Sequence, residues 1–147
     1  MKDQHIIALG GGGFTTGTSL ALDDYILQVA DKSCPKICFV PTASGDRGDY
    51  TFKFYQHFSL QKDHCKPTHL PLFKRKVKDL VDFACSQDII YVGGGNTANM
   101  LAIWHLHGFD LALQKALAEG VILAGMSAGS ICWFQFGVDD SFGEDLK

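Results

Sequence analysis

The 147-residue chain lacks the paired cysteines that define two common classes of small protein. Its five cysteines are scattered, without a C-x-x-C pair, and the two nearest in sequence are Cys34 and Cys38. Structural zinc sites and disulfide-rich secreted domains both need cysteines at short, regular spacing. The pattern argues against either class and is typical of a reducing compartment, so we expect a cytoplasmic protein with no metal site.

Long apolar runs and an excess of basic residues are also missing. No segment approaches the roughly 20 apolar residues that a transmembrane helix requires, so no membrane association is expected. The N-terminus enters an apolar stretch near Ile6 without the charged region and cleavage site of a secretory signal. A formal net charge of −3 gives no electrostatic basis for binding nucleic acid.

The composition that remains fits one compact domain. Hydrophobic residues make up 46% of the chain and charged residues 20%, which suits a folded domain rather than a disordered segment. Short apolar runs alternate with amphipathic stretches, which is the pattern of βαβ units. We therefore expect a single α/β domain over residues 1–147, with a mostly parallel sheet and helices on both faces.

Periodicity and turn residues place the individual elements. Strands are expected at residues 5–9, 36–40, 68–72, 88–92 and 121–124, and helices at 22–29, 49–59, 77–83, 97–104, 109–117 and 130–134. The strand at 68–72 is expected at a sheet edge, because Pro67 and Pro71 lack the amide protons that a central strand needs. The adjacent acids Asp23 and Asp24 are expected on a solvated helix face rather than at a metal site.

A serine motif follows the last predicted strand directly. Residues 125–129 read G-M-S-A-G, which is G-x-S-x-G between a strand and a helix. Such a nucleophile elbow needs a very tight turn, and side chains at Gly125 or Gly129 would collide with the neighbouring strand and helix. The following helix directs its first amides toward the serine oxygen, where negative charge develops during acyl transfer. We predict that Ser127 is a nucleophile; the alternative is a turn in which Ser127 only caps the helix.

A glycine-rich loop follows the strand before it. Residues 93–97 read G-G-G-N-T, and ligands of open parallel sheets bind at the carboxyl ends of the strands. Amides of this loop could supply the oxyanion donors that face Ser127, with the side-chain amide of Asn96 as a further donor. The alternative is a turn in which Asn96 or Thr97 caps the next helix, and the two interpretations are compatible.

The same glycines allow a dinucleotide-binding interpretation. Gly93, Gly95 and Ala98 fit the pattern G-x-G-x-x-G/A. That fingerprint expects a carboxylate about 20 residues later, at the end of the next strand, where this chain has A-G-M-S at 124–127. A non-catalytic domain that binds a nucleotide or another small molecule therefore stays as the alternative function.

Two motifs, Y-V-G-G-G-N-T at 91–97 and A-G-M-S-A-G-S at 124–130, together resemble the peptidase E / cyanophycinase family of serine peptidases. The resemblance extends to D-D-S-F-G at 139–143. It implies a flavodoxin-like sheet similar to that of class I glutamine amidotransferases, and hydrolysis of short, aspartyl-type peptide substrates without a metal or organic cofactor. The site residues that it implies are the nucleophile Ser127, the oxyanion and substrate loop Gly94, Gly95, Asn96 and Ala128, and an acidic partner at Asp140.

The general base of that family is a histidine downstream of the nucleophile, and this chain has none there. All six histidines precede Ser127, and 147 − 127 = 20 residues follow it. A serine without a base is a weak nucleophile at neutral pH. We expect a fragment of a longer enzyme, truncated at its carboxyl end; an upstream histidine such as His105 or His107, or a non-catalytic relative, would also explain the pattern. A sheet without its last strands exposes apolar edges, so self-association into a homo-oligomer is expected.

Two further residues near the predicted site carry expectations. Arg47 follows the strand at 36–40, where it could pair bidentately with a substrate carboxylate or lie in an ordinary turn between Asp46 and Asp49. Cys132, one turn after Ser127, is expected to be a buried, small apolar residue rather than a nucleophile.

Overall fold

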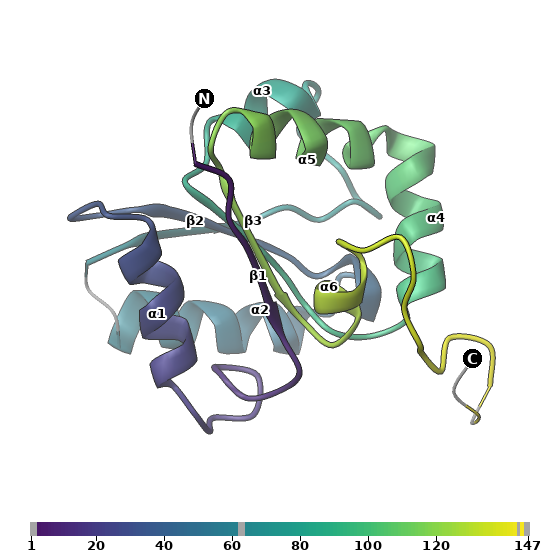
Figure 1. The fold of residues 1–147 in the computed structure, drawn as a ribbon, viewed down its shortest axis with the longest axis horizontal. Coiled ribbons are helices and arrows are strands. Elements are labelled where there is room, and N and C mark those ends of the chain that lie inside the picture. Colours follow the sequence, from purple (N-terminus) through teal and green to yellow (C-terminus); the bar gives the residue numbers. More distant parts are fainter. Residues whose placement is uncertain (1–2, 62–63, 144, 146–147) are drawn as a thin grey trace.

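Five parallel strands form one sheet at the centre of the computed structural model, which describes residues 3–61, 64–143 and 145 (Figure 1). Their order across the sheet is β1-β5-β4-β2-β3, and each of the four pairings is parallel. The strands are β1 (Ile6–Leu9), β2 (Lys36–Val40), β3 (Lys66–His69), β4 (Ile89–Val92) and β5 (Ile122–Met126). The helices are α1 (Ala21–Val29), α2 (Gly48–Tyr55), α3 (Leu80–Cys85), α4 (Thr97–His107), α5 (Phe109–Ala118) and α6 (Ala128–Ile131), with a 3₁₀ turn at Thr42–Ser44 and a π-helical turn at Gln56–Gln61.

The central strands form a parallel sheet because both of their faces are buried. Every residue of β4 and β5 is buried, and these strands read as continuous apolar runs rather than alternating ones. The register aligns their carboxyl ends, since Val92 pairs with Gly125 and Leu9 pairs with Met126. The predicted α/β class with a parallel, flavodoxin-like sheet is confirmed.

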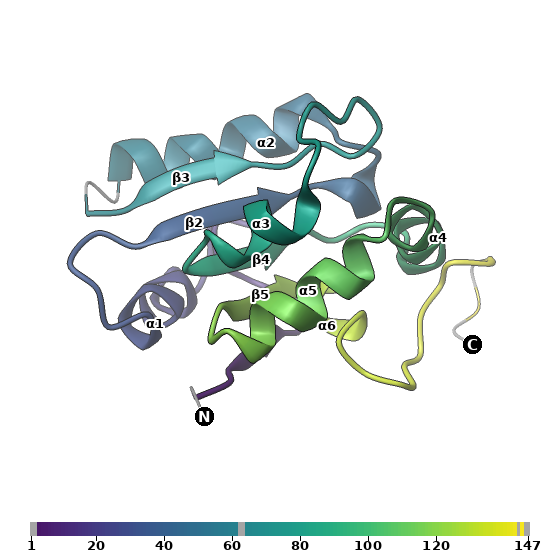
Figure 2. The ribbon, with the colours of Figure 1, turned by 90° about the horizontal axis from the view of Figure 1, so that it is seen from above.

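Helices cover both faces of the sheet: in Figure 1, α3 and α5 lie above the strands and α1 and α2 lie below them, and Figure 2 looks down onto the side of α3 and α5. On one face, α1 and α2 bury aromatic side chains around Phe14, whose ring lies 5.5 Å from that of Phe39 and 5.6 Å from that of Phe54. On the other face, α3, α4 and α5 pack around Trp104, whose indole nitrogen donates to the Thr42 hydroxyl at 3.3 Å. Each face thus has its own core, and the sheet separates the two.

Several boundaries differ from the predicted ones for identifiable reasons. The edge position of the third strand is confirmed, but the strand begins at Lys66 and includes Pro67, which pairs with Ile37. α3 begins three residues later than predicted, because the Asp79 side chain caps it by accepting a hydrogen bond from the amide of Asp82 at 2.9 Å.

The prediction that Asp23 lies on a solvated face is wrong. Asp23 is fully buried in α1, and its Oδ2 lies 3.2 Å from Nε2 of His57, a side chain that is 5% exposed. A Cβ on Gly13 would come within 2.8 Å of Asp23 Oδ1, so the glycine run leaves room for this carboxylate. The long-range partner, 34 residues away along the chain, could not be recognised from the local pattern.

Among the residues that the structure describes, no helix has both the length and the apolar character needed to cross a membrane.

Candidate active site

A cleft of about 500 Å³ opens at the carboxyl edge of the sheet. Four strands supply its walls, because the loops that follow β1, β2, β4 and β5 all meet there. The chain leaves β2 toward β3 on one side and leaves β4 toward β5 on the other, which is the topological switch where open α/β sheets bind ligands. The lining residues are Thr15, Ala43, Ser44, Arg47, Asp49, Tyr50, Lys53, Gly94, Gly95, Met126 and Ser127.

A larger hollow of about 600 Å³ lies at the opposite edge of the sheet, around Asp88 and Gly120. Neither glycine motif reaches it, and its cation Lys32 is already paired with Asp88. The smaller cleft, which contains both motifs, is therefore the candidate active site.

Ser127 occupies the tight turn between β5 and α6. Its backbone has φ 55° and ψ −118°, a conformation that side-chain-bearing residues rarely adopt, and its side chain is exposed. The amide of Ser127 donates to the carbonyl of Leu9 at 3.1 Å, which fixes the turn to the neighbouring strand. The sheet edge thus presents this hydroxyl to the cleft.

Both glycines of the serine motif are required by close backbone packing. A Cβ on Gly125 would lie 2.1 Å from the carbonyl oxygen of Gly129, and a Cβ on Gly129 would lie 2.1 Å from that of Val92. Real Cβ atoms do not approach other atoms this closely. The collisions predicted from the sequence are therefore confirmed.

The glycine loop after β4 lies directly beside Ser127. A Cβ on Gly94 would lie 3.3 Å from Cβ of Ser127 and 3.8 Å from its Oγ. Gly95 has φ +144°, and a Cβ there would lie 2.1 Å from the carbonyl oxygen of Ala43, so only glycine fits. The structure brings the two predicted motifs together.

Tyr50, which sequence reasoning missed, is bonded to this loop. The amide of Gly94 donates to the Tyr50 hydroxyl at 3.2 Å, and that hydroxyl lies 2.9 Å from Oγ1 of Thr15. The Gly94 amide is therefore engaged in the free protein. In the sequence Tyr50 was only one aromatic of a predicted helix, and nothing local signalled its contact with a loop 44 residues away.

Ala128 opens α6 and is buried. The amides of Ser130 and Ile131 both donate to the carbonyl of Ser127, at 2.8 and 3.0 Å, and close the first turn. The amide of Ala128 precedes these bonds, at the position where a helix leaves its first N–H groups available to a ligand.

Asn96 serves as the N-cap of α4. Its Oδ1 accepts from the amide of Asn99 at 2.8 Å, and its Nδ2 donates to the carbonyl of Ser141 at 3.0 Å. Both ends of the side-chain amide are thus bonded away from the cleft. Asn96 therefore caps α4, as the alternative interpretation expected, and its side-chain amide does not face the oxyanion position.

Asp140 is exposed on the segment that runs past α4 after α6 (Figure 1), and it does not line the cleft. The carboxylate of its neighbour Asp139 is hydrogen-bonded, since Oδ1 accepts from the amide of Ser141 at 2.8 Å. Hydrogen bonds from Ser141 lower the pKa of Asp139 below its ordinary value. The structure does not bring Asp140 to Ser127.

Within the described ranges, the cleft contains no histidine side chain. His57 is buried beside Asp23, the Nδ1 of His69 lies 2.8 Å from the Tyr55 hydroxyl, and His105 is exposed beside Asp110. Neither of the two upstream histidines considered above, His105 and His107, reaches the cleft. In the same ranges no group of three or more His, Cys, Asp or Glu side chains is arranged to hold a metal ion.

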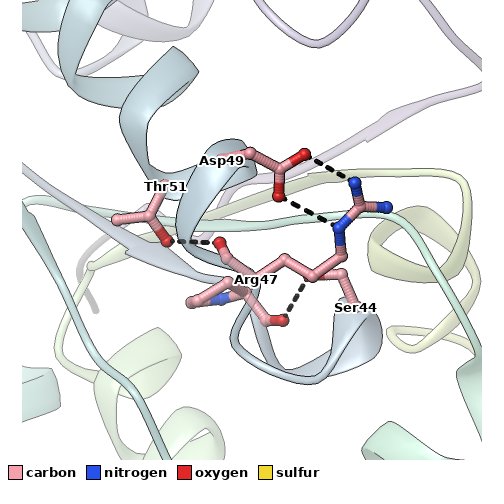
Figure 3. A network of polar contacts seen from close by, with 5 residues as sticks. Ser44, Arg47, Asp49 and Thr51 are labelled. Atoms are coloured by element: carbon pink, nitrogen blue, oxygen red, sulfur yellow. Dashed lines mark hydrogen bonds and ion pairs between the residues drawn. The ribbon is translucent and has the colours of Figure 1, made fainter.

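Charged side chains of α2 and the preceding loop line the cleft. Figure 3 shows the contact between two of them, Arg47 and Asp49. Arg47 donates to Asp49 through Nε at 3.0 Å and through Nη2 at 2.5 Å. This hydrogen-bonded contact lowers the pKa of Asp49. Lys53, which the sequence analysis did not single out, lines the same cleft.

Cys132 is half-buried and its thiol donates to the carbonyl of Gly129 at 3.4 Å. Desolvation by burial raises the pKa of this thiol, so it is not a thiolate at neutral pH.

These features define the class: a parallel α/β domain with an exposed serine on a strained strand-to-helix turn beside a glycine loop. The pattern of Peptidase family S51 matches residues 6–147, and the chain belongs to this family. The uncharacterized peptidase YgaJ of Bacillus subtilis (strain 168) is 51% identical over 141 residues, which are 95% of this chain and 60% of YgaJ.

Two solved structures share the fold. A peptidase E-type protein from Listeria monocytogenes EGD-e has a TM-score of 0.61 at 19% identity, covering 89% of this chain and 61% of that one. A peptidase from an acI-B1 Actinobacterium has a TM-score of 0.65 at 20% identity, covering 86% of this chain and 55% of that one. The chain thus spans about 60% of the length of these relatives.

Proposed function

We propose that this chain carries the nucleophile of a serine peptidase that hydrolyses short peptides with an aspartyl residue. The observation that carries the proposal is Ser127, exposed and backbone-strained beside Gly94 in a cleft of about 500 Å³. Family membership and the similarity to YgaJ support a peptidase.

The proposed chemistry is acyl transfer through an activated serine. Ser127 Oγ attacks the peptide carbonyl, its proton passes to a general base, and the amine leaves with that proton, which gives an acyl ester of Ser127. A water molecule, deprotonated by the same base, then attacks the ester and releases the acid, and the proton returns to Ser127 Oγ. The amides of Gly95 and Ala128 stabilise the developing oxyanion, because both belong to turns that adjoin Ser127. Gly94 joins them once its amide exchanges the Tyr50 hydroxyl for the oxyanion.

The general base belongs to a longer form of the protein in this proposal. Its support is the absence of histidine from the described lining of the cleft, together with the 60% share of YgaJ that the chain spans. The 147 residues alone would then bind substrate and acylate slowly, because a serine without a base reacts poorly at neutral pH.

The test is active-site labelling followed by a peptidase assay. A fluorophosphonate is incubated with the 147-residue chain and with the full gene product, and intact mass is followed over time. We expect one adduct per chain at Ser127, formed faster in the longer form, and hydrolysis of an aspartyl dipeptide by that form. Ser127→Ala abolishes both, whereas Ser33→Ala, which alters an exposed serine outside the cleft lining, retains both.

Absence of an adduct and of hydrolysis in both forms would overturn the peptidase proposal. The cleft would then be assigned to the alternative class, a domain that binds a small molecule without catalysis.

A further inference from the structure

The α2 side of the Ser127 cleft carries more positive than negative groups. Arg47 precedes α2 and Lys53 lies within it, and both side chains line the cleft. Asp49, in the first turn of the same helix, is the carboxylate that shares this lining. A ligand that enters the cleft therefore meets two positive groups and one negative group.

Arg47 already holds a carboxylate in the free protein. Its Nε and Nη2 donate to the two oxygens of Asp49 in the fork geometry that guanidinium groups use to bind carboxylates (Figure 3). Both side chains are exposed, at 64% and 60%, so water surrounds the pair. Exposed pairs of this kind exchange partners at little cost.

The backbone beneath Arg47 is fixed, in contrast to its side chain. Its carbonyl accepts from the amide of Thr51 at 3.1 Å and from the Thr51 hydroxyl at 3.0 Å. The preceding turn is closed by the Ser44 hydroxyl, which donates to the carbonyl of Pro41 at 2.8 Å (Figure 3). The position of the Arg47 backbone at the cleft is thus set by hydrogen bonds, while its guanidinium remains free to exchange one carboxylate for another.

We propose that Arg47 is a specificity-determining residue: it binds a carboxylate of the substrate, and Asp49 occupies the guanidinium as an internal competitor until substrate arrives. The inference rests on the proposed function for the reaction that follows, but binding itself does not need Ser127 chemistry. The carboxylate can belong to an aspartyl side chain or to a peptide C-terminus, and both offer the same two oxygens to the fork.

The experiment measures binding to the 147-residue chain by NMR titration with three probes. Acetyl-aspartyl amide carries only a side-chain carboxylate, acetyl-alanine carries only a terminal one, and acetyl-asparaginyl amide carries none. The probe that binds more tightly than the neutral one identifies the source of the carboxylate. Equal binding of all three would overturn the proposal.

Four variants separate fork binding from general charge attraction. Arg47→Gln is expected to weaken the preferred acidic probe about tenfold, and Arg47→Lys to weaken it by several-fold, because lysine keeps the charge but loses the fork. Asp49→Asn is expected to tighten that probe about threefold by removing the competitor. Lys53→Gln is the matched control and should change binding less than Arg47→Gln, with the neutral probe unchanged throughout.

An acidic probe that binds Arg47→Gln as well as the wild type, or more weakly to Asp49→Asn, would refute the inference, as would equal losses in Arg47→Gln and Lys53→Gln. These outcomes are separable from the peptidase test. If Ser127 is acylated but the Arg47 variants bind the acidic probe as tightly as the wild type, only this inference is refuted. If the variants change probe affinity as expected but Ser127 is not acylated, only the peptidase proposal is refuted, and the cleft remains a carboxylate-binding site.

Discussion

Ser127→Gly should make the protein more stable than Ser127→Ala, although both variants remove the same hydroxyl. At φ 55° and ψ −118° the Cβ of residue 127 crowds its own backbone. Such a conformation costs about 1–3 kcal/mol for a residue with a side chain, and almost nothing for glycine. Glycine also gains freedom in the unfolded chain, which offsets about 0.5–1 kcal/mol of that difference.

The free energy of unfolding of Ser127→Gly should therefore be about 0.5–2 kcal/mol higher than that of Ser127→Ala. For a domain of this size that difference corresponds to a melting temperature roughly 2–6 °C higher. Urea denaturation of the two variants, followed by far-ultraviolet circular dichroism and by tryptophan fluorescence, measures it directly. Coincident transitions from the two signals would justify a two-state treatment.

Ala128→Gly is the control, because it makes the same kind of change one residue later. Ala128 is buried at the start of α6, where glycine should lower stability by about 1 kcal/mol. If Ser127→Gly were no more stable than Ser127→Ala, the turn would store no strain. Residue 127 would then present its hydroxyl to the cleft at no cost in stability, contrary to the prediction.

Three more predictions concern packing, acid stability and thiol reactivity. Gly129→Ala should lose at least about 2 kcal/mol in free energy of unfolding, because its Cβ would meet the Val92 carbonyl oxygen at 2.1 Å. The control Gly10→Ala, with nothing within 4 Å of its Cβ, should change that free energy by less than about 1 kcal/mol in the same urea titration. Equal losses in the two variants would contradict the prediction. Partial burial favours protonation of Asp88, but hydrogen bonds from Lys32 and from the Lys36 amide outweigh it and lower the pKa of Asp88 below 3.8. The stability that this carboxylate contributes is therefore present above pH 3.8 and lost as the pH falls through the lowered pKa. Asp88→Asn should be less stable than the wild type at pH 7 and should lose less stability than the wild type as the pH falls. An Asp88→Asn variant with the acid profile of the wild type would contradict this prediction. Iodoacetamide at neutral pH should modify exposed Cys34 well before Cys38, since burial raises the pKa of the Cys38 thiol to about 12. Peptide mass spectrometry measures the two rates of modification, and equal rates would contradict this prediction.

Apolar runs and their spacing predicted the strands well. The bounds of β2 agree with the sequence, and β4 begins one residue later than predicted. Both strands have buried residues in succession, a signal that does not depend on distant partners. Helix starts were harder, because the first turn depends on a cap such as Asp79, whose side chain must point back along the chain.

The candidate site was predicted in its backbone parts and missed in its side-chain parts. Gly125 and Gly129 could be explained in advance, because a tight strand-to-helix turn excludes side chains whatever surrounds it. Tyr50 and Thr15 could not, since the Tyr50 hydroxyl joins helix α2 to the loop of Thr15 and to the loop of Gly94, which follow three different strands. The burial of Asp23 against His57 escaped for the same reason.

The sequence by itself determined the alternation of strands and helices, the parallel class of the sheet and the position of Ser127 at a strand's carboxyl end. These follow from local periods and from the backbone freedom of glycine, which neighbouring residues along the chain decide. Only the tertiary structure decided which loops meet, because the strand order β1-β5-β4-β2-β3 places the loops after β2 and β4 beside Ser127. That order is set by the packing of two cores on opposite faces of the sheet, and it brings Arg47 and Tyr50 into the cleft where Ser127 lies.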